Sequence, residues 1–172
     1  MEITGKDRGD AWLGEIGFSR VDAEAFQSNL KESMAYEIPK DSGRKTALAR
    51  LLASLVNGDS KSLFWITGYG IWPSSENREL FRGYRQSLGE LRSLGEAPCH
   101  FFEKPDLAQI ECLILMALYF VWDAIIIEGS GNQVFKLSHD EIMTIETKDP
   151  QHLSFLKTKL EKFKLKPVQE KE

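Results

Sequence analysis

The spacing of apolar and polar positions predicts five helices along the chain. The first, capped by Asp22, would carry Phe26, Leu30 and Met34 on one face. The segment 106–122 is apolar almost all round, which is typical of a buried helix that is covered on every side. The remaining helices would begin near Ser42, Ser75 and Pro150.

Extended segments lie between these helices. Residues 62–69 are rich in β-branched and aromatic types, and residues 98–102 are a shorter candidate strand. Residues 124–128 and 133–137 flank a glycine-rich turn, and residues 141–147 alternate apolar and polar positions. The pattern predicts an α+β fold: one small mixed or antiparallel sheet of about four strands, with helices packed mainly on one face.

The predicted domain organisation is simple. Residues 1–20 are polar and glycine-rich and are interpreted as an N-terminal arm, with room for a short strand at 11–18. Residues 21–166 would form a single α+β domain, and residues 167–172 a C-terminal tail. With 172 residues, of which 42% are hydrophobic, the chain is long enough to bury a substantial core.

Charge and composition narrow the classes of partner and compartment. The formal net charge of -4 argues against general nucleic-acid binding, which needs a positive surface. The longest apolar run, Cys112 to Trp122, is too short for a bilayer, which takes about 20 residues. Two cysteines are too few for a disulfide framework. The first ten residues are polar, which is not typical of a signal peptide. The sequence therefore predicts a cytoplasmic protein with no membrane or nucleic-acid partner.

Three arginines form a stripe on the predicted helix that begins near Ser75. At about 100° per residue, Arg78, Arg82 and Arg85 fall within about 60° of one another, beside the apolar face of Leu80, Phe81, Tyr84 and Leu88. Guanidinium groups match carboxylate and phosphate, so the stripe is a candidate site for a small anionic ligand or an acidic partner. The alternative is a solvated flank whose arginines pair with neighbouring acids.

The turn before this helix adds three candidate binding residues. Trp72 precedes Pro73, which holds it extended, and an aromatic residue at a rigid turn is a suitable interface anchor. Ser74 and Ser75 open the helix, where free N–H groups attract anions. Core packing of Trp72 and ordinary helix capping by the serines explain the same residues without a function.

One cluster is a weak candidate for catalysis. His139 is followed by Asp140 and Glu141, and a histidine beside carboxylates can act as a general base. No nucleophile is tied to it by a motif, and a polar turn between two strands explains the cluster equally well. Cys99 is adjacent to His100, but neighbours on a strand point to opposite faces, so Cys99 is expected to be buried and inert. The sequence predicts no metal site and no cofactor.

Four motifs together resemble a family of bacterial proteins of unknown function that carries a G-I-W-P-S-S-E-N pattern. They are GIWPSSEN at 70–77, YRQSLGE at 84–90, EAPCHFF at 96–102 and SHDE at 138–141. The resemblance covers residues 63–141. The family pattern has an aromatic residue where this chain has Arg78, and a glycine where it has Cys99. The resemblance implies no activity, ligand or partner.

Two functions are consistent with the sequence. The first is a non-enzymatic protein–protein interaction module, immunity-type or adaptor-like, that binds a protein partner or a second copy of itself. The second is a small hydrolase or transferase in which His139 and Asp140 act as an acid–base pair. Whether the chain is an enzyme is left open, with the absence of a complete catalytic motif favouring the first function.

Overall fold

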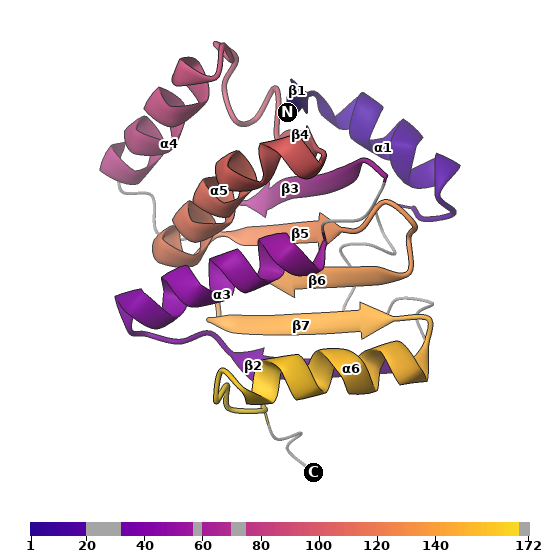
Figure 1. Ribbon diagram of the computed structural model, residues 1–172. Coiled ribbons are helices and arrows are strands. Elements are labelled where there is room, and N and C mark those ends of the chain that lie inside the picture. The colour runs from indigo at the N-terminus through magenta and orange to yellow at the C-terminus, as the bar shows by residue number, and fades with distance from the viewer. Residues whose placement is uncertain (20–31, 57–59, 70–74, 169–172) are drawn as a thin grey trace.

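The computed structural model describes residues 1–19, 32–56, 60–69 and 75–168 (Figure 1). The strands are β1 (Glu2–Thr4), β2 (Glu32–Glu37), β3 (Ser62–Gly68), β4 (Cys99–Phe102), β5 (Asp123–Ile127), β6 (Gln133–Leu137) and β7 (Ile142–Thr147). The helices are α1 (Lys6–Glu15), α3 (Ser42–Leu55), α4 (Ser75–Ser87), α5 (Leu107–Phe120) and α6 (Pro150–Glu161), with a 3-10 turn η1 at Lys104–Asp106.

The strands form one antiparallel sheet of seven, in the order β1-β4-β3-β5-β6-β7-β2. The α+β class is confirmed, but the expectation of about four strands is wrong. The strands missed are those at the two edges. β1 has only three residues, too few to show a period, and β2 contains Met34, which had been assigned to a helix with Phe26 and Leu30. Phe26 and Leu30 lie outside the described residues.

Alternation along the central strands divides the core into two layers. One face of the sheet carries Phe64, Ile66, Ile126 and Phe135, and packs against α3, α5 and α6. The other carries Leu63, Trp65 and Ile125, and packs against Trp12 and Leu13 of α1. Figure 1 shows α3, α5 and α6 in front of the sheet. The N-terminal segment is thus helical at 6–15, where a short strand at 11–18 had been considered, and it covers the second face.

The apolar helix expected at 106–122 is α5. Its residues Ile110, Leu113, Ile114, Ala117 and Leu118 are buried, and it packs beside α3 over the sheet. It ends at Val121, whose positive φ of 57° closes the helix in the left-handed conformation. The chain then turns so that Trp122 lies under α4 and Asp123 begins β5.

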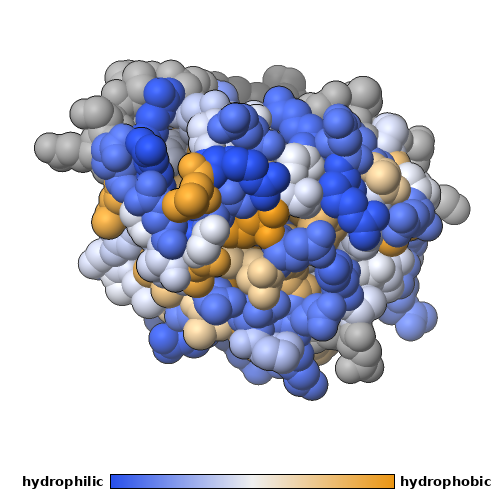
Figure 2. Space-filling model, turned by 90° about the horizontal axis from the view of Figure 1, so that it is seen from above, coloured by the Kyte–Doolittle hydropathy of each residue, from blue (hydrophilic) through white to orange (hydrophobic). Residues whose placement is uncertain are grey.

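In the part of the chain that the structure describes, none of the helices combines the length and the apolar character needed to cross a bilayer. Figure 2 shows one face of the molecule on which a small group of hydrophobic side chains is surrounded by hydrophilic ones. Among the described residues, Leu91 and Leu80 are the large apolar side chains with the most exposure, at 75% and 61%.

Candidate functional site

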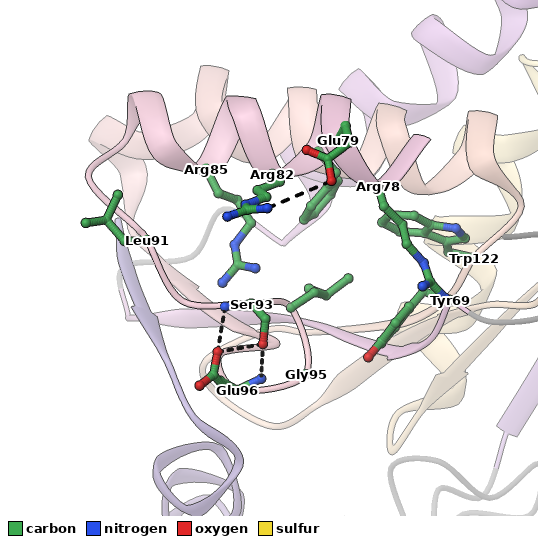
Figure 3. A pocket seen from close by; sticks show the side chains of 12 residues that line it. Tyr69, Arg78, Glu79, Arg82, Arg85, Leu91, Ser93, Gly95, Glu96 and Trp122 are labelled. Carbon is green, nitrogen blue, oxygen red and sulfur yellow. Dashed lines mark hydrogen bonds and ion pairs between the residues drawn. The ribbon is translucent and has the colours of Figure 1, made fainter. Parts of the chain in front are cut away.

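A pocket of about 430 Å³ opens between α4 and the loop that joins α4 to β4. We call it the arginine pocket. Figure 3 shows that α4 forms one wall and the loop at 91–96 the opposite wall, with Tyr69 and Trp122 at one end. It is lined by Tyr69, Arg78, Glu79, Phe81, Arg82, Arg85, Leu91, Ser93, Leu94, Gly95, Glu96 and Trp122. Its volume is in the range typical of small-ligand sites.

All three arginines of the predicted stripe line this pocket, but they differ in environment. Arg78 and Arg82 are exposed, whereas Arg85 is only 2% exposed. The guanidinium of Arg78 lies 5.1 Å from the ring centre of Tyr69, and Arg82 lies 3.9 Å from the carboxylate of Glu79. The helix therefore presents two cationic groups at the rim and a third inside.

Arg85 is a buried charge whose hydrogen bonds are incomplete. One terminal nitrogen donates to the carbonyl of Ala97 at 2.6 Å, while Nε, also buried, has no acceptor. Among the described residues, no carboxylate lies within ion-pair distance of it. Burial lowers the pKa of Arg85, and the nearby charge of Glu90 opposes this effect. The pocket therefore contains a positive group with an unused donor.

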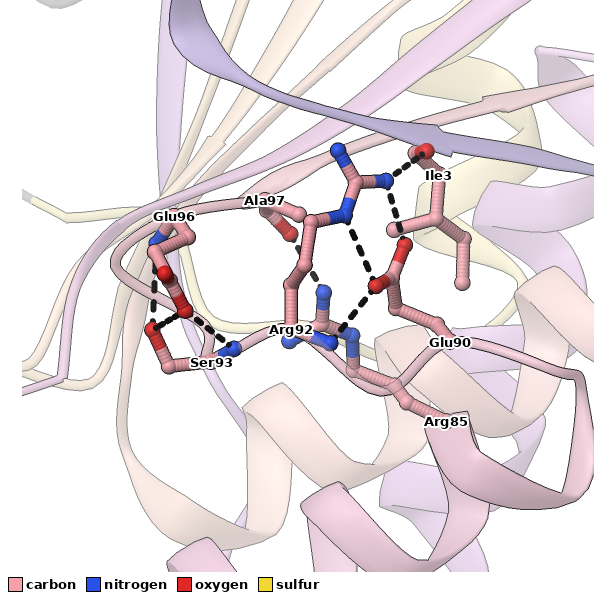
Figure 4. A network of polar contacts seen from close by, with 7 residues as sticks. All are labelled: Ile3, Arg85, Glu90, Arg92, Ser93, Glu96 and Ala97. Carbon is pink, nitrogen blue, oxygen red and sulfur yellow. Dashed lines mark hydrogen bonds and ion pairs between the residues drawn. The ribbon is translucent and has the colours of Figure 1, made fainter.

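The loop wall is held in place by a separate polar network (Figure 4). Glu90, 8% exposed, accepts hydrogen bonds from the Arg92 backbone and side chain, and Arg92 also donates to the carbonyl of Ile3 at 2.7 Å. These contacts, mainly the hydrogen bond from Arg92, lower the pKa of Glu90. Since Glu90 is already bound to Arg92, it does not neutralise Arg85 directly.

Glu96 belongs to the same loop wall of the arginine pocket. Its carboxylate accepts hydrogen bonds from the backbone N–H and the hydroxyl of Ser93, at 2.8 and 2.6 Å. These bonds lower the pKa of Glu96, which is exposed. The pocket thus has an acceptor group opposite its cationic wall, as Figure 3 shows for Arg85 and Glu96.

A neutral histidine lies behind the pocket. His100 of β4 is fully buried against the rings of Phe64 and Phe81, and its Nδ1 lies 3.3 Å from the carbonyl of Phe64. Burial, followed by the charge of Arg85, lowers the pKa of His100 to about 3. At neutral pH, Arg85 is therefore the charged member of this pair.

The apolar face assigned to α4 from the sequence is only partly correct. Phe81 is buried and Tyr84 half-buried, as expected, but Leu80 is exposed and Arg85 takes a buried position. The boundary between the buried and the exposed face of α4 therefore passes through the arginine stripe, with Arg85 on the buried side and Arg78 and Arg82 on the exposed side. Helical spacing places these residues on one side but does not reveal which of them the loop at 89–97 covers.

His139 lies in a second pocket, of about 340 Å³, at the turn between β6 and β7. Its Nδ1 lies 2.9 and 3.0 Å from the two carboxylate oxygens of Asp123, and the same carboxylate accepts its backbone N–H. Asp140 lies on the other side of the ring, 3.5 Å from Nε2. In the tautomer in which Nδ1 donates to Asp123, Nε2 faces the carboxylate of Asp140. The carboxylate that orients the ring is thus Asp123, and not the adjacent Asp140 or Glu141 that the sequence suggests.

The remaining candidates lie apart from these pockets or outside the described residues. Glu141 takes the positive-φ position of the β6–β7 turn, at 59°, and lies 3.8 Å from Lys40. Trp72 and Ser74 lie outside the described residues, and Ser75 is placed only as the first residue of α4. Cys99 is fully buried on the face of β4 opposite His100, as predicted. No three His, Cys, Asp or Glu side chains of the described segments are grouped to hold a metal ion.

Several pocket residues carry no local sequence signal. Tyr69 directly follows β3, and Trp122 lies in the short connection between α5 and β5. Ser93 and Glu96 belong to an irregular loop. One weak signal was available: Glu90 and Arg92 bracket an apolar residue in a segment without helical or alternating spacing. Such a segment is typical of a functional loop, but its partners are set by the tertiary fold.

Comparison of the chain with known proteins found no similar protein. The chain matches no protein-family model, no curated protein and no solved structure.

Proposed function

We propose that the chain is a non-enzymatic protein–protein interaction module, immunity-type or adaptor-like, that binds an anionic group of its partner in the arginine pocket. The observation that supports this most is Arg85, a buried guanidinium with an unpaired Nε and no ion-pair partner among the described residues. The charge of Glu90 acts on Arg85 only at a distance, and burying an ion costs about several kcal/mol that a direct partner would offset. An incoming anion would remove this cost in the bound state.

The rim of the pocket suits a macromolecular partner. Arg78 and Arg82 are exposed and add positive charge beside Arg85, although the chain as a whole is acidic. Leu91, 75% exposed, lies on the rim, and arginine together with exposed apolar side chains is typical of interface anchors. Local positive charge steers an acidic partner toward the pocket, and the apolar rim contributes area.

Other parts of this proposal rest on the sequence alone. Trp72, Ser74 and Ser75 are proposed to extend the binding surface from the start of α4. The partner is a protein, with self-association through the same surface as the competing outcome. We propose a cytoplasmic location, which agrees with the scarcity of cysteine.

A charge-reversal experiment tests the proposed surface. Tagged wild-type chain and the variant Arg78→Glu, Arg82→Glu are used to capture proteins from native lysate with reversible cross-linking, and captured proteins are quantified by mass spectrometry. The matched control is Lys157→Glu, Lys159→Glu, because both lysines are exposed on α6 and give the same change in charge. We expect a partner that the wild type and the control retain and the pocket variant loses. Equal capture by all three chains would remove the pocket from the proposal.

A second candidate function is supported by the contact between His139 and Asp123. A histidine whose Nδ1 is held by a carboxylate, inside a pocket, has the arrangement of a general base. In this alternative, a small hydrolase or transferase, Nε2 takes a proton from an attacking water or hydroxyl, and Asp140 lies beside it. No serine or cysteine is hydrogen-bonded to the ring among the described residues.

This alternative has its own test. Hydrolysis of a panel of activated esters and phosphodiesters is measured for the wild type, His139→Gln and Asp123→Asn. A general base predicts a loss of about 10²- to 10⁴-fold in His139→Gln. Activity that is absent in the wild type, or equal in all three chains, would rule out this role. Because the arginine pocket is unchanged in both variants, capture of a protein partner should be unaffected.

A further inference from the structure

The arginine pocket has two chemically different ends. At one end, Arg85 faces Ser93 and Glu96 across the opening, and at the other, Tyr69 and Trp122 meet beside Arg78 (Figure 3). The aromatic end is continuous: the ring centres of Tyr69 and Trp122 are 6.2 Å apart, and those of Trp122 and Phe81 are 5.1 Å apart. A ligand that fills the pocket must therefore combine a polar, charged group with an apolar group.

The charged end requires a ligand that both accepts and donates hydrogen bonds. Arg85 lines this end with a guanidinium whose buried Nε–H has no acceptor, and a guanidinium suits an oxyanion. Opposite it, Glu96 is ionised at neutral pH and spends two contacts on Ser93, while a carboxylate has about four acceptor positions. A doubly charged phosphate would be repelled by Glu96, and by Glu79 at the rim. A single carboxylate with a neighbouring N–H donor satisfies both walls.

The end of a polypeptide chain has this combination of groups. Its α-carboxylate, last side chain and last amide N–H are attached to one carbon, so all three enter a pocket together. An internal aspartate or glutamate brings a carboxylate without an apolar group. Its chain must also pass in and out of the opening, whereas a chain end requires space for only one strand. A volume of about 430 Å³ is in the range of sites that enclose a small group, which a chain end can supply.

We propose that the arginine pocket receives the free C-terminus of a partner polypeptide. The α-carboxylate binds Arg85, the last amide N–H donates toward Glu96 or Ser93, and an apolar last side chain packs toward Tyr69 and Trp122. Capture of a terminal carboxylate is an established mode of peptide recognition. This inference rests on the proposed function, because it specifies which group of the protein partner is bound.

The test varies the ligand and leaves the protein unchanged. ¹⁵N-labelled wild-type chain is titrated with acetyl-Ala-Ala-X tripeptides, in which X is Phe, Leu or Gly, in the free-acid form. The amide of the Phe peptide, benzoate and inorganic phosphate are titrated in parallel. The signals of the Arg85 Nε–H and the Trp122 indole N–H report on the two ends of the pocket. We expect the Phe or Leu acid to bind at least about tenfold more tightly than the amide, since a charge-assisted bond is lost.

Protein variants complete the test. Lys157→Gln, at an exposed position of α6 outside the pocket, should leave the binding of the free acid unchanged. Arg85→Lys keeps the charge without the planar fork and should weaken it about tenfold, with circular dichroism confirming that the variant is folded. The Gly peptide should bind more weakly than the Phe or Leu peptide, because it lacks the apolar side chain.

Three results would overturn the inference. They are equal binding of the acid and the amide, absence of shifts with every free-acid peptide at millimolar concentration, and tighter binding of benzoate or phosphate than of the peptides. The last result would assign the pocket to a small anionic ligand. If the peptides fail while the reversal of Arg78 and Arg82 still abolishes capture of a partner, the interaction module stands and only the C-terminal assignment falls.

Discussion

Replacing Arg85 by methionine separates a binding role from a structural one, because the two roles predict opposite changes in stability. Arg85 is 2% exposed, donates one hydrogen bond to Ala97 and has an unpaired Nε. If Arg85 is retained for folding, its replacement should destabilise the chain. A residue retained for a ligand should stabilise the unbound chain when an apolar side chain of similar length replaces it.

The magnitude follows from two opposing effects. Loss of the donor leaves the buried carbonyl of Ala97 without this hydrogen bond, which costs about 1–3 kcal/mol. Removal of a buried charge without a direct partner avoids a desolvation penalty of about several kcal/mol. Methionine is flexible enough to fill the space. We expect Arg85→Met to raise the free energy of unfolding by about 1–2 kcal/mol, and the melting temperature by about 2–4 °C for each kcal/mol.

Urea unfolding at pH 7, followed by circular dichroism, measures this change. Arg92→Met serves as the control with the opposite sign, since it leaves the carboxylate of Glu90, 8% exposed, without its hydrogen bonds from the Arg92 side chain. Arg85→Met should fail to bind the free-acid peptides because the guanidinium is lost, and of the two variants only Arg85→Met should gain stability. A loss of more than about 2 kcal/mol in Arg85→Met would show that the bond to Ala97 dominates and that Arg85 is retained for folding rather than for a ligand.

Three further predictions concern other parts of the molecule. The pKa of His100, lowered to about 3 by burial, means that below pH 6.5 the unfolded chain binds a proton that the folded chain does not. Stability should therefore fall by up to about 2 kcal/mol between pH 6.5 and pH 5, and His100→Leu should abolish this dependence in urea titrations; an unchanged slope would contradict it. A Cβ at Gly9 of α1 would lie 2.6 Å from Sγ of Cys99 and 2.8 Å from the ring of Trp65, so Gly9→Ala should destabilise the chain. Gly14→Ala on the same helix meets nothing within 4 Å and should stabilise it by about 0.5–1 kcal/mol; the same sign for both in thermal melts would contradict the packing of α1. Asp123→Asn should convert the imidazole of His139 from the Nδ1–H form to a mixture of tautomers in ¹⁵N spectra, and an unchanged spectrum would show that Asp123 does not orient the ring.

Elements with strong internal periodicity were correctly predicted from the sequence. The helix at 106–122, the hairpin of β5 and β6 and the strand at 62–69 all appear, because burial imposes a regular apolar pattern on them. The edge strand β2 was missed because half-exposed edge strands have a weak alternation, and Met34 also fits a helical spacing. The close packing of Gly9 against Trp65, which fixes α1, leaves no trace in a hydrophobic pattern.

The candidate site could be predicted to a similar extent. Helical geometry alone grouped Arg78, Arg82 and Arg85, since residues three and four apart share a face. The burial of Arg85 depends on the loop at 89–97, whose position is fixed by the contact of Arg92 with β1. The contact of Asp123 with His139 likewise depends on the pairing of β5 with β6, which brings residues 16 apart together. Both are products of tertiary structure.

The two edge strands of the sheet, β1 and β2, precede in sequence every strand with which they pair. Glu2 lies opposite Phe101, and Glu32 opposite Thr147, so each edge strand leaves the ribosome long before its neighbour has been synthesised. The hairpins of the last three central strands are local and can form first. During translation the nascent chain therefore carries strands without partners, a state in which chaperones protect many proteins from aggregation. The strand β1 can pair once β4 has been made, whereas β2 must wait for β7, near the end of synthesis.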